Sequence, residues 1–227
     1  MCSKRVCQLP LRMRCPTRAE VGGTLGAVLI TGFATGAAET NCYLVAPRAG
    51  GAALVIDPGE DAVPTLEYYF AVNELSPAAV LLTSGRREVT GSAFDLCAGW
   101  DIPVYLHPAD RDLLTDPPEI LRDLTDGEIR LAEIVVHVDH TPGHTAGSLV
   151  YRVLADTDEG PATVAFTGHT LGFRTVGGPG CDSDRRQLLR SIREKLLVLD
   201  DDTVVLPAHG TSTTIGDERR HNKHLDA

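Results

Sequence analysis

Short apolar runs separated by turn-forming residues dominate the sequence, and this pattern constrains the fold more than any other feature. Each run is rich in valine, leucine or isoleucine and stops near a polar, glycine or proline residue, which is typical of buried β-strands. We expect strands at Val28–Thr31, Cys42–Ala46, Ala53–Asp57, Val80–Thr83, Val104–His107, Ile134–Asp139, Leu149–Leu154, Thr163–Thr167 and Thr203–Leu206.

Helical patterns alternate with these runs. We expect helices at Pro64–Asn73, Gly91–Trp100, Pro108–Leu114 and Ser183–Leu199. The last of these contains five apolar residues, Leu188, Leu189, Ile192, Leu196 and Val198, and Asp and Ser residues before it can cap it. Two sheets facing each other with helices outside would bury all of these residues, so we predict an α/β protein with an αββα sandwich. The 227 residues suit one such domain.

Residues 1–27 differ in charge from the rest of the chain. Their basic residues, opposed only by Glu20, are Lys4, Arg5, Arg12, Arg14 and Arg18. We therefore expect a disordered N-terminal extension over residues 1–27 and a folded domain over residues 28–227. The alternative is a secretory signal that is cleaved after Ala38, but such a cut would remove the predicted strand Val28–Thr31.

Composition narrows the class of partner and the compartment. The net charge of −10 argues against a surface for nucleic acid, and no apolar stretch reaches the roughly 20 residues that a membrane span needs. The six cysteines contain no C-x-x-C pair, and a chain of this length has no need of disulfides. We expect reduced thiols and a cytoplasmic protein.

Polar clusters follow several of the predicted strands. They are Asp57–Gly59, Thr83–Val89, His140–Thr145, Thr167–Thr170 and Pro207–Gly210. Sheet folds place their binding and catalytic groups in loops of this kind, so these clusters are the candidate site.

The order and spacing of these clusters resemble the successive motifs of the metallo-β-lactamase superfamily. The segments Asn41–Leu44, Val55–Gly59, His140–Thr145 and Ser212–Ile215 resemble the short glyoxalase-II-like (hydroxyacylglutathione hydrolase-like) members. The resemblance implies an αββα sandwich of the metallo-β-lactamase type. It also implies a hydrolytic centre of two zinc or iron ions, about 3.5–4 Å apart, that polarise a thioester or amide.

The metal-binding motif is degenerate in this sequence. The family pattern is Thr-His-x-His-x-Asp-His, but its four ligand positions hold Ser84, Arg86, Glu88 and Val89. Arginine is always protonated, so Arg86 would place a fixed positive charge where the family holds a dication. By this resemblance, three of the four ligands are absent.

Three histidines match other ligand positions of the family. His144 and His209 match histidine ligands, whereas His169 replaces the bridging aspartate. An imidazole offers one lone pair in line with one metal and cannot bridge two ions. We therefore expect no cofactor, or a single weakly held zinc or iron ion on Glu88, His144, His169 and His209.

Three functions remain open from the sequence. The first is a non-catalytic or repurposed member that binds an anionic small molecule through Arg86, Arg87 and the histidines. The second is a mononuclear metal-dependent hydrolase of thioesters or related esters, and the third is a folded interaction module.

Four further residues have structural interpretations. By resemblance, Asp57 orders the neighbouring loops by accepting hydrogen bonds. His107 is expected to be a structural residue at a strand end. His221 and His224 are expected to be solvated in a charged tail.

Overall fold

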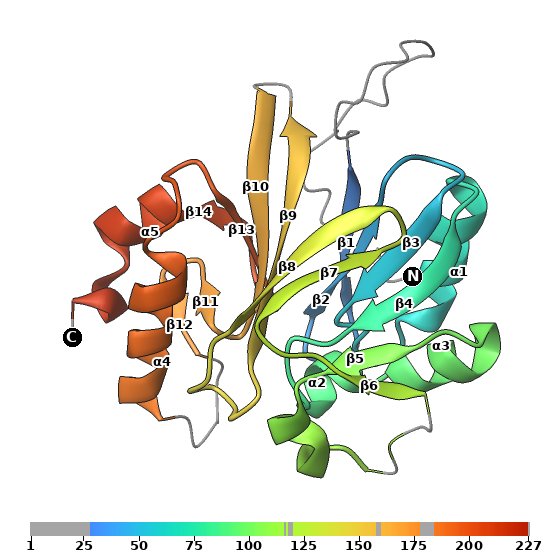
Figure 1. Ribbon diagram of the computed structural model, residues 1–227, viewed down its shortest axis with the longest axis horizontal. Coiled ribbons are helices and arrows are strands. Elements are labelled where there is room, and N and C mark those ends of the chain that lie inside the picture. The colour runs from blue at the N-terminus through green and yellow to red at the C-terminus, as the bar shows by residue number, and fades with distance from the viewer. Residues whose placement is uncertain (1–27, 116, 118–119, 158–159, 178–183, 227) are drawn as a thin grey trace, which may run out of the picture.

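The computed structural model describes residues 28–115, 117, 120–157, 160–177 and 184–226. The expected extension over residues 1–27 lies outside these ranges. Two sheets face each other and helices cover their outer faces, so the predicted αββα sandwich is confirmed (Figure 1). No helix within the described ranges has the length and apolar character needed to cross a membrane.

The first sheet is built from residues 29–123. Its strands, in spatial order, are β1 (Leu29–Thr35), β2 (Thr40–Ala46), β3 (Ala52–Ile56), β4 (Ser76–Leu81), β5 (Val104–Leu106) and β6 (Leu121–Asp123). The strands β1, β2 and β3 are antiparallel, and β3 to β6 run parallel. Parallel neighbours need crossovers, which α1 (Val63–Val72) and α3 (Ala93–Trp100) supply.

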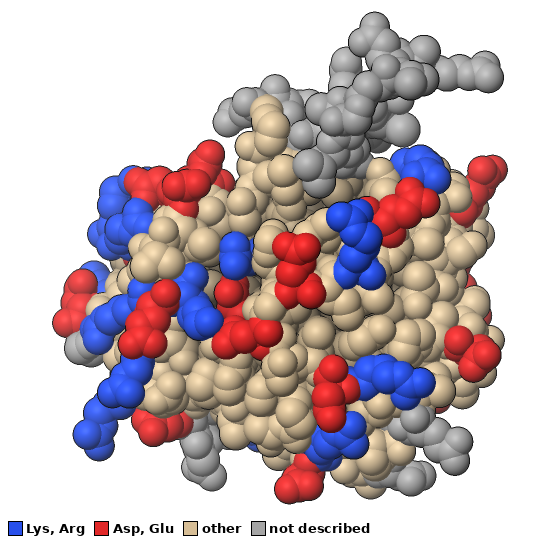
Figure 2. Space-filling model, in the orientation of Figure 1, with Lys and Arg blue, Asp and Glu red and all other residues tan. Residues whose placement is uncertain are grey.

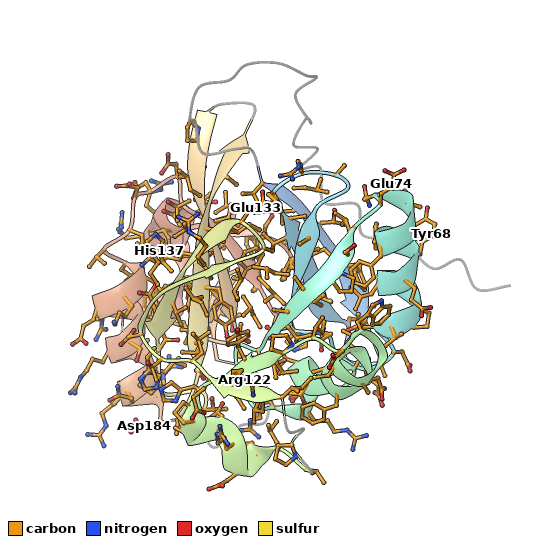
Figure 3. The ribbon with its side chains drawn as sticks, turned by 45° about the vertical axis from the view of Figure 1, so that its right-hand side comes forward. Tyr68, Glu74, Arg122, Glu133, His137 and Asp184 are labelled. Atoms are coloured by element: carbon orange, nitrogen blue, oxygen red, sulfur yellow. The ribbon has the colours of Figure 1, made fainter. Side chains whose placement is uncertain are left out.

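The second sheet is built from residues 127–214. Its strands, in spatial order, are β14 (Thr213–Thr214), β13 (Val204–Pro207), β10 (Gly160–Gly168), β9 (Leu149–Thr157), β8 (Ile134–His140) and β7 (Gly127–Leu131). A small hairpin of β11 (Leu171–Gly172) and β12 (Thr175–Val176) precedes α4 (Arg185–Ser191), and α5 (Ile215–His221) follows β14. Asp184 begins α4 on the opposite side of the molecule from Tyr68, which points outward from α1 (Figure 3).

Alternation along β2 explains how one strand serves two cores. Cys42 and Leu44 are buried against the outer helices, whereas Tyr43 and Val45 are buried between the sheets. Successive side chains of a strand point to opposite faces, so a strand that is covered on both sides reads as a continuous apolar run. Tyr151 also lies between the sheets, and its hydroxyl donates to the carbonyl oxygen of Leu82 at 2.6 Å.

Several predicted helices differ from those observed. The segment 183–199 forms α4 and one wider helical turn over Ile192–Leu196, so Val198 lies beyond the helix and is 70% exposed instead of packed. In the segment 91–100 the helix α3 begins at Ala93, two residues later than predicted, and a separate short helix, α2 (Arg87–Thr90), precedes it. The segment Pro108–Leu113 forms a 3-10 helix.

The C-terminal segment was wrongly expected to be a tail. It forms α5 and a short 3-10 helix, Lys223–Leu225, and only its histidines behave as expected, because His221 and His224 are exposed. The sequence of α5 lacks an apolar stripe that would predict a helix, because the residue that fixes this helix is the buried Glu218.

Candidate functional site

The loops that follow β4, β8, β10 and β13 meet at one edge of the sandwich. Backbone bonds join them in pairs: the amide of Leu149 donates to Thr83 at 2.8 Å, and that of Ala208 donates to Gly168 at 2.8 Å. The hydroxyls of Thr141 and Thr170 lie 3.0 Å apart. Four of the polar clusters noted in the sequence therefore adjoin one another.

Three histidines gather on these loops. The rings of His144 and His169 stack with centroids 4.4 Å apart and planes 10° apart, and both side chains are buried. His209 is half-buried, and its Nε2 lies 3.0 Å from Nε2 of His169. One of these two nitrogens must donate and the other must accept, because a hydrogen bond needs one N–H and one lone pair.

Burial keeps two of these rings uncharged. It lowers the pKa of His169 to about 3 and that of His144 to about 4, and the positive charge of Arg86 adds to both shifts. Both imidazoles are therefore neutral at pH 7, and each can offer one donor and one acceptor.

Arg86 lies directly before α2 in extended backbone, with φ −69° and ψ 141°. In the part of the chain that the structure describes, its guanidinium is the one fixed positive charge that lowers the pKa of both His144 and His169. Nε of Arg86 and Nδ1 of His169 are buried and have no hydrogen-bond partner among the described residues. Buried polar atoms normally have a partner, so each of these two atoms is a candidate contact for a further group.

The next three residues, Arg87, Glu88 and Val89, lie away from the three histidines. The Arg87 side chain is 90% exposed and lies 4.0 Å from Glu60, while Val89 is fully buried in the core. Glu88 is exposed, and with Arg87 and Thr40 it lines a surface hollow of about 230 Å³. Its negative charge reaches His144, where it raises the pKa slightly against the larger effect of burial.

These residues do not fit the two-metal centre that the superfamily implies. Zinc needs three or four nitrogen, oxygen or sulfur ligands about 2.0–2.3 Å from the ion. Within the described ranges, no three histidine, cysteine, aspartate or glutamate side chains converge in such a way. The structure brings His144, His169 and His209 together with Arg86, and it places Arg87 and Glu88 at the neighbouring hollow.

Asp57 secures the loop that carries Arg86. Its carboxylate accepts from the Thr83 amide at 2.8 Å and from the Thr83 hydroxyl at 2.7 Å, which is the ordering role expected from the sequence. Burial raises the pKa of Asp57 to about 7, although both hydrogen bonds act in the opposite direction. Gly168 packs so closely here that an added Cβ would lie 2.3 Å from Oγ1 of Thr83.

Three supporting residues were not identified as such from the sequence. Asp110 is completely buried and accepts hydrogen bonds from two of the site loops. Asn41 and Tyr43 both donate to the carbonyl oxygen of Pro207, at 2.9 and 2.7 Å, and so hold the loop of His209. Asn41 and Tyr43 lie in a quoted family motif, whereas no local pattern marks Asp110.

His107 has the structural role that was expected. Its Nδ1 accepts from the Ala109 amide at 3.2 Å and caps the 3-10 helix, and its ring stacks on His140 with centroids 4.0 Å apart.

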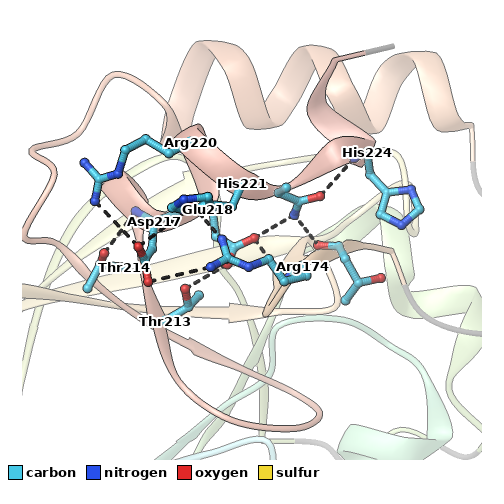
Figure 4. A network of polar contacts seen from close by, with 10 residues as sticks. Arg174, Thr213, Thr214, Asp217, Glu218, Arg220, His221 and His224 are labelled. Carbon is cyan, nitrogen blue, oxygen red and sulfur yellow. Dashed lines mark hydrogen bonds and ion pairs between the residues drawn. The ribbon is translucent and has the colours of Figure 1, made fainter.

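A second polar network fixes the C-terminal helix (Figure 4). The buried carboxylate of Glu218 accepts from the Arg174 amide at 3.0 Å, from the Thr213 hydroxyl at 2.7 Å and from Nδ2 of Asn222 at 2.7 Å. These bonds join α5 to the turn between β11 and β12, so the helix is held by a buried charge and not by a broad apolar stripe.

Facing sheets, outer helices and histidine-bearing loops at one edge define the class of protein, an αββα sandwich of the metallo-β-lactamase type. The chain belongs to the Metallo-beta-lactamase superfamily, whose sequence pattern matches residues 35–209.

Relatives and a solved structure agree with this family. The chain is 45% identical to an uncharacterized protein of Mycobacterium tuberculosis, over 88% of this chain and 98% of that one. It is 31% identical to the hydroxyacylglutathione hydrolase GloC of Haemophilus influenzae, over 83% and 94% of the two chains. The crystal structure of the B3 metallo-beta-lactamase BLEG-1 matches with a TM-score of 0.77 and 30% identity, over 88% of this chain and all of that one. The glyoxalase-II-like resemblance is confirmed by the second of these.

Proposed function

We propose that this chain has lost the dinuclear hydrolytic centre of its superfamily and binds a small anion at Arg86 and the neighbouring histidines. The observation that carries the proposal is the pair of buried atoms without a partner in the described structure, Nε of Arg86 and Nδ1 of His169. Arg86 supplies an N–H donor on a permanent cation, which is the group that recognises carboxylate and phosphate oxygens best.

Electrostatics favours an anion over a metal ion at this place. A unit positive charge and a dication about 4 Å apart repel each other by roughly 8 kcal/mol at an effective dielectric constant of 20. The same guanidinium attracts an anion, and the buried surroundings strengthen that attraction. We place Arg87 at the outer rim of the site, because its side chain lies in solvent.

The competing function is a mononuclear hydrolase of thioesters or related esters. One observation supports it: Nε2 of His169 and Nε2 of His209 lie 3.0 Å apart, a spacing that two nitrogen ligands of one ion can also take. It requires a third ligand from Glu88 or His144, and hence a movement of these side chains.

Metal content and anion binding, measured on the same purified full chain, separate the two functions. We expect less than one equivalent of zinc or iron, and a rise in thermal midpoint with phosphate or acetate that Arg86→Gln abolishes. Arg48→Gln is the matched control, because Arg48 is exposed and pairs with Glu133 far from the site. One tightly held ion with metal-dependent thioester hydrolysis that His209→Ala abolishes would favour the hydrolase. Two tightly held ions would contradict both.

A further inference from the structure

Asp110 joins the loop of Arg86 to the loop of His144. We propose that Asp110 is a positioning residue: its buried carboxylate accepts from Gly85, Thr145 and Gly147, and thereby fixes Arg86 and His144 relative to each other. The inference rests on the proposed function, because it deepens the account of that same anion site.

The two carboxylate oxygens divide the contacts between the loops. Oδ2 accepts from the Gly85 amide at 2.8 Å and from the Thr145 hydroxyl at 2.7 Å, and Oδ1 accepts from the Gly147 amide at 2.6 Å. Gly85 directly precedes Arg86, and Thr145 directly follows His144. A rotation of this one carboxylate would therefore disturb the backbone beside both pocket residues.

Close packing makes the contact rigid. An added Cβ on Gly85 would lie 2.6 Å from the carbonyl oxygen of Asp110, and one on Gly147 would lie 2.7 Å from its Cγ. Both loops thus approach Asp110 at distances that only glycine permits. The 3-10 helix Pro108–Leu113, which carries Asp110, contacts both of them.

The contacts require a group that accepts at every oxygen. An ionised carboxylate only accepts, whereas an asparagine at the same place would turn its amide donors toward an N–H or a hydroxyl. Asp110→Asn therefore preserves volume and breaks at least one contact. Thr145→Val is a milder variant, which removes the hydroxyl bond and leaves both glycine amides in place.

Glu218→Gln is the matched control. Glu218 is also fully buried, also accepts three hydrogen bonds, and touches neither the loop of Arg86 nor that of His144. We expect both variants to lower the thermal midpoint. Asp110→Asn, unlike Glu218→Gln, should also weaken the binding of phosphate and acetate by about ten-fold. It should also move the ring signals of His144 in NMR spectra of the ligand-free full chain. Thr145→Val should produce the same changes in smaller measure.

The NMR arm tests the inference independently of the anion. If Asp110→Asn or Thr145→Val folds and leaves the His144 signals as in the wild type, or if Glu218→Gln moves them equally, the positioning role is wrong. If the wild type binds neither phosphate nor acetate while the Asp110 and Thr145 variants alone move these signals, the positioning role is supported and the proposed function fails.

Discussion

Arg86 is the residue on which the chemistry of the site depends. By resemblance it stands at a ligand position of the superfamily motif, and the arginine side chain is a permanent cation. The pKa values of the neighbouring imidazoles, His144 and His169, are both lowered, first by burial and in addition by the charge of Arg86. Arg86 thus reinforces the larger effect of burial on both rings.

Asp57 gives a prediction on pH and stability. The pKa of Asp57 is raised in the folded protein from 3.8 to about 7, so its protonated form is favoured there. Its contribution to stability is complete below pH 4 and is lost as the pH rises toward 7. The loss amounts to at most about 4 kcal/mol, since one pKa unit corresponds to about 1.4 kcal/mol.

Asp57→Asn isolates this effect from other titrating groups. Asparagine carries no charge, so the free energy of unfolding of wild type minus that of the variant should fall between pH 4 and pH 7. Urea denaturation at several pH values measures this difference. A difference that stays constant across the window would contradict the raised pKa of Asp57.

At the scale of elements, the strands were the easier part of the prediction. Runs that are covered on both faces, such as β2 and β3, are apolar along most of their length, and their predicted bounds lie within two residues of those observed. Edge strands carry less signal: β7 is mostly exposed, and its sequence Gly127–Leu131 holds two charged residues. The helix α5 was missed for a related reason, since polar bonds anchor it.

The site was predictable where it rests on motifs and not where it rests on tertiary contacts. His144, His169 and His209 stand at spacings that a family pattern supplies, and the structure brings them together. Asp110 makes its bonds to residues 25, 35 and 37 positions away. No local window of sequence contains such partners, so only the folded chain identifies it.

The segment that carries Arg86 offers a restoration experiment. The changes Ser84→His, Arg86→His, Glu88→Asp and Val89→His, combined with His169→Asp, recreate the ligand set of the superfamily. Zinc should bind to this five-fold variant, whereas Arg86→His alone should bind little, because it removes the repulsive charge without supplying the other ligands. Zinc stoichiometry, measured beside the wild type, gives the result.

The same variant should lose some stability, because Val89 is fully buried and an imidazole there places a polar ring in the core. Zinc binding that is equal in the wild type and the five-fold variant would contradict the proposed loss of the centre. Thioester hydrolysis should stay low even when zinc binds, because the five substitutions supply metal ligands and no contacts that position a substrate. Positioning alone contributes several kcal/mol.

At the scale of the whole molecule, the surface mixes both signs of charge. Lys and Arg lie beside Asp and Glu across the face in Figure 2, and surface ion pairs such as Arg111 with Asp123 are of this kind. Such pairs contribute at most about 1 kcal/mol each.

The boundary at residue 28 leads to a prediction on truncation. Val28 packs into the core between the sheets, and β1 begins at Leu29. A chain that starts at Val28 should unfold at the same thermal midpoint as the full chain. A midpoint several degrees lower would show that residues before Val28 contribute to the packing, and the boundary would move toward the N-terminus.

Each sheet comes from one unbroken stretch of chain, the first from residues 29–123 and the second from residues 127–214. All strand pairs of a sheet are therefore made within one half of the chain. Arg86 belongs to the first half, and His144, His169 and His209 belong to the second. The site is accordingly complete only where the two sheets are packed together, so a molecule that contacts Arg86 and the histidines binds the folded chain alone and raises its free energy of unfolding.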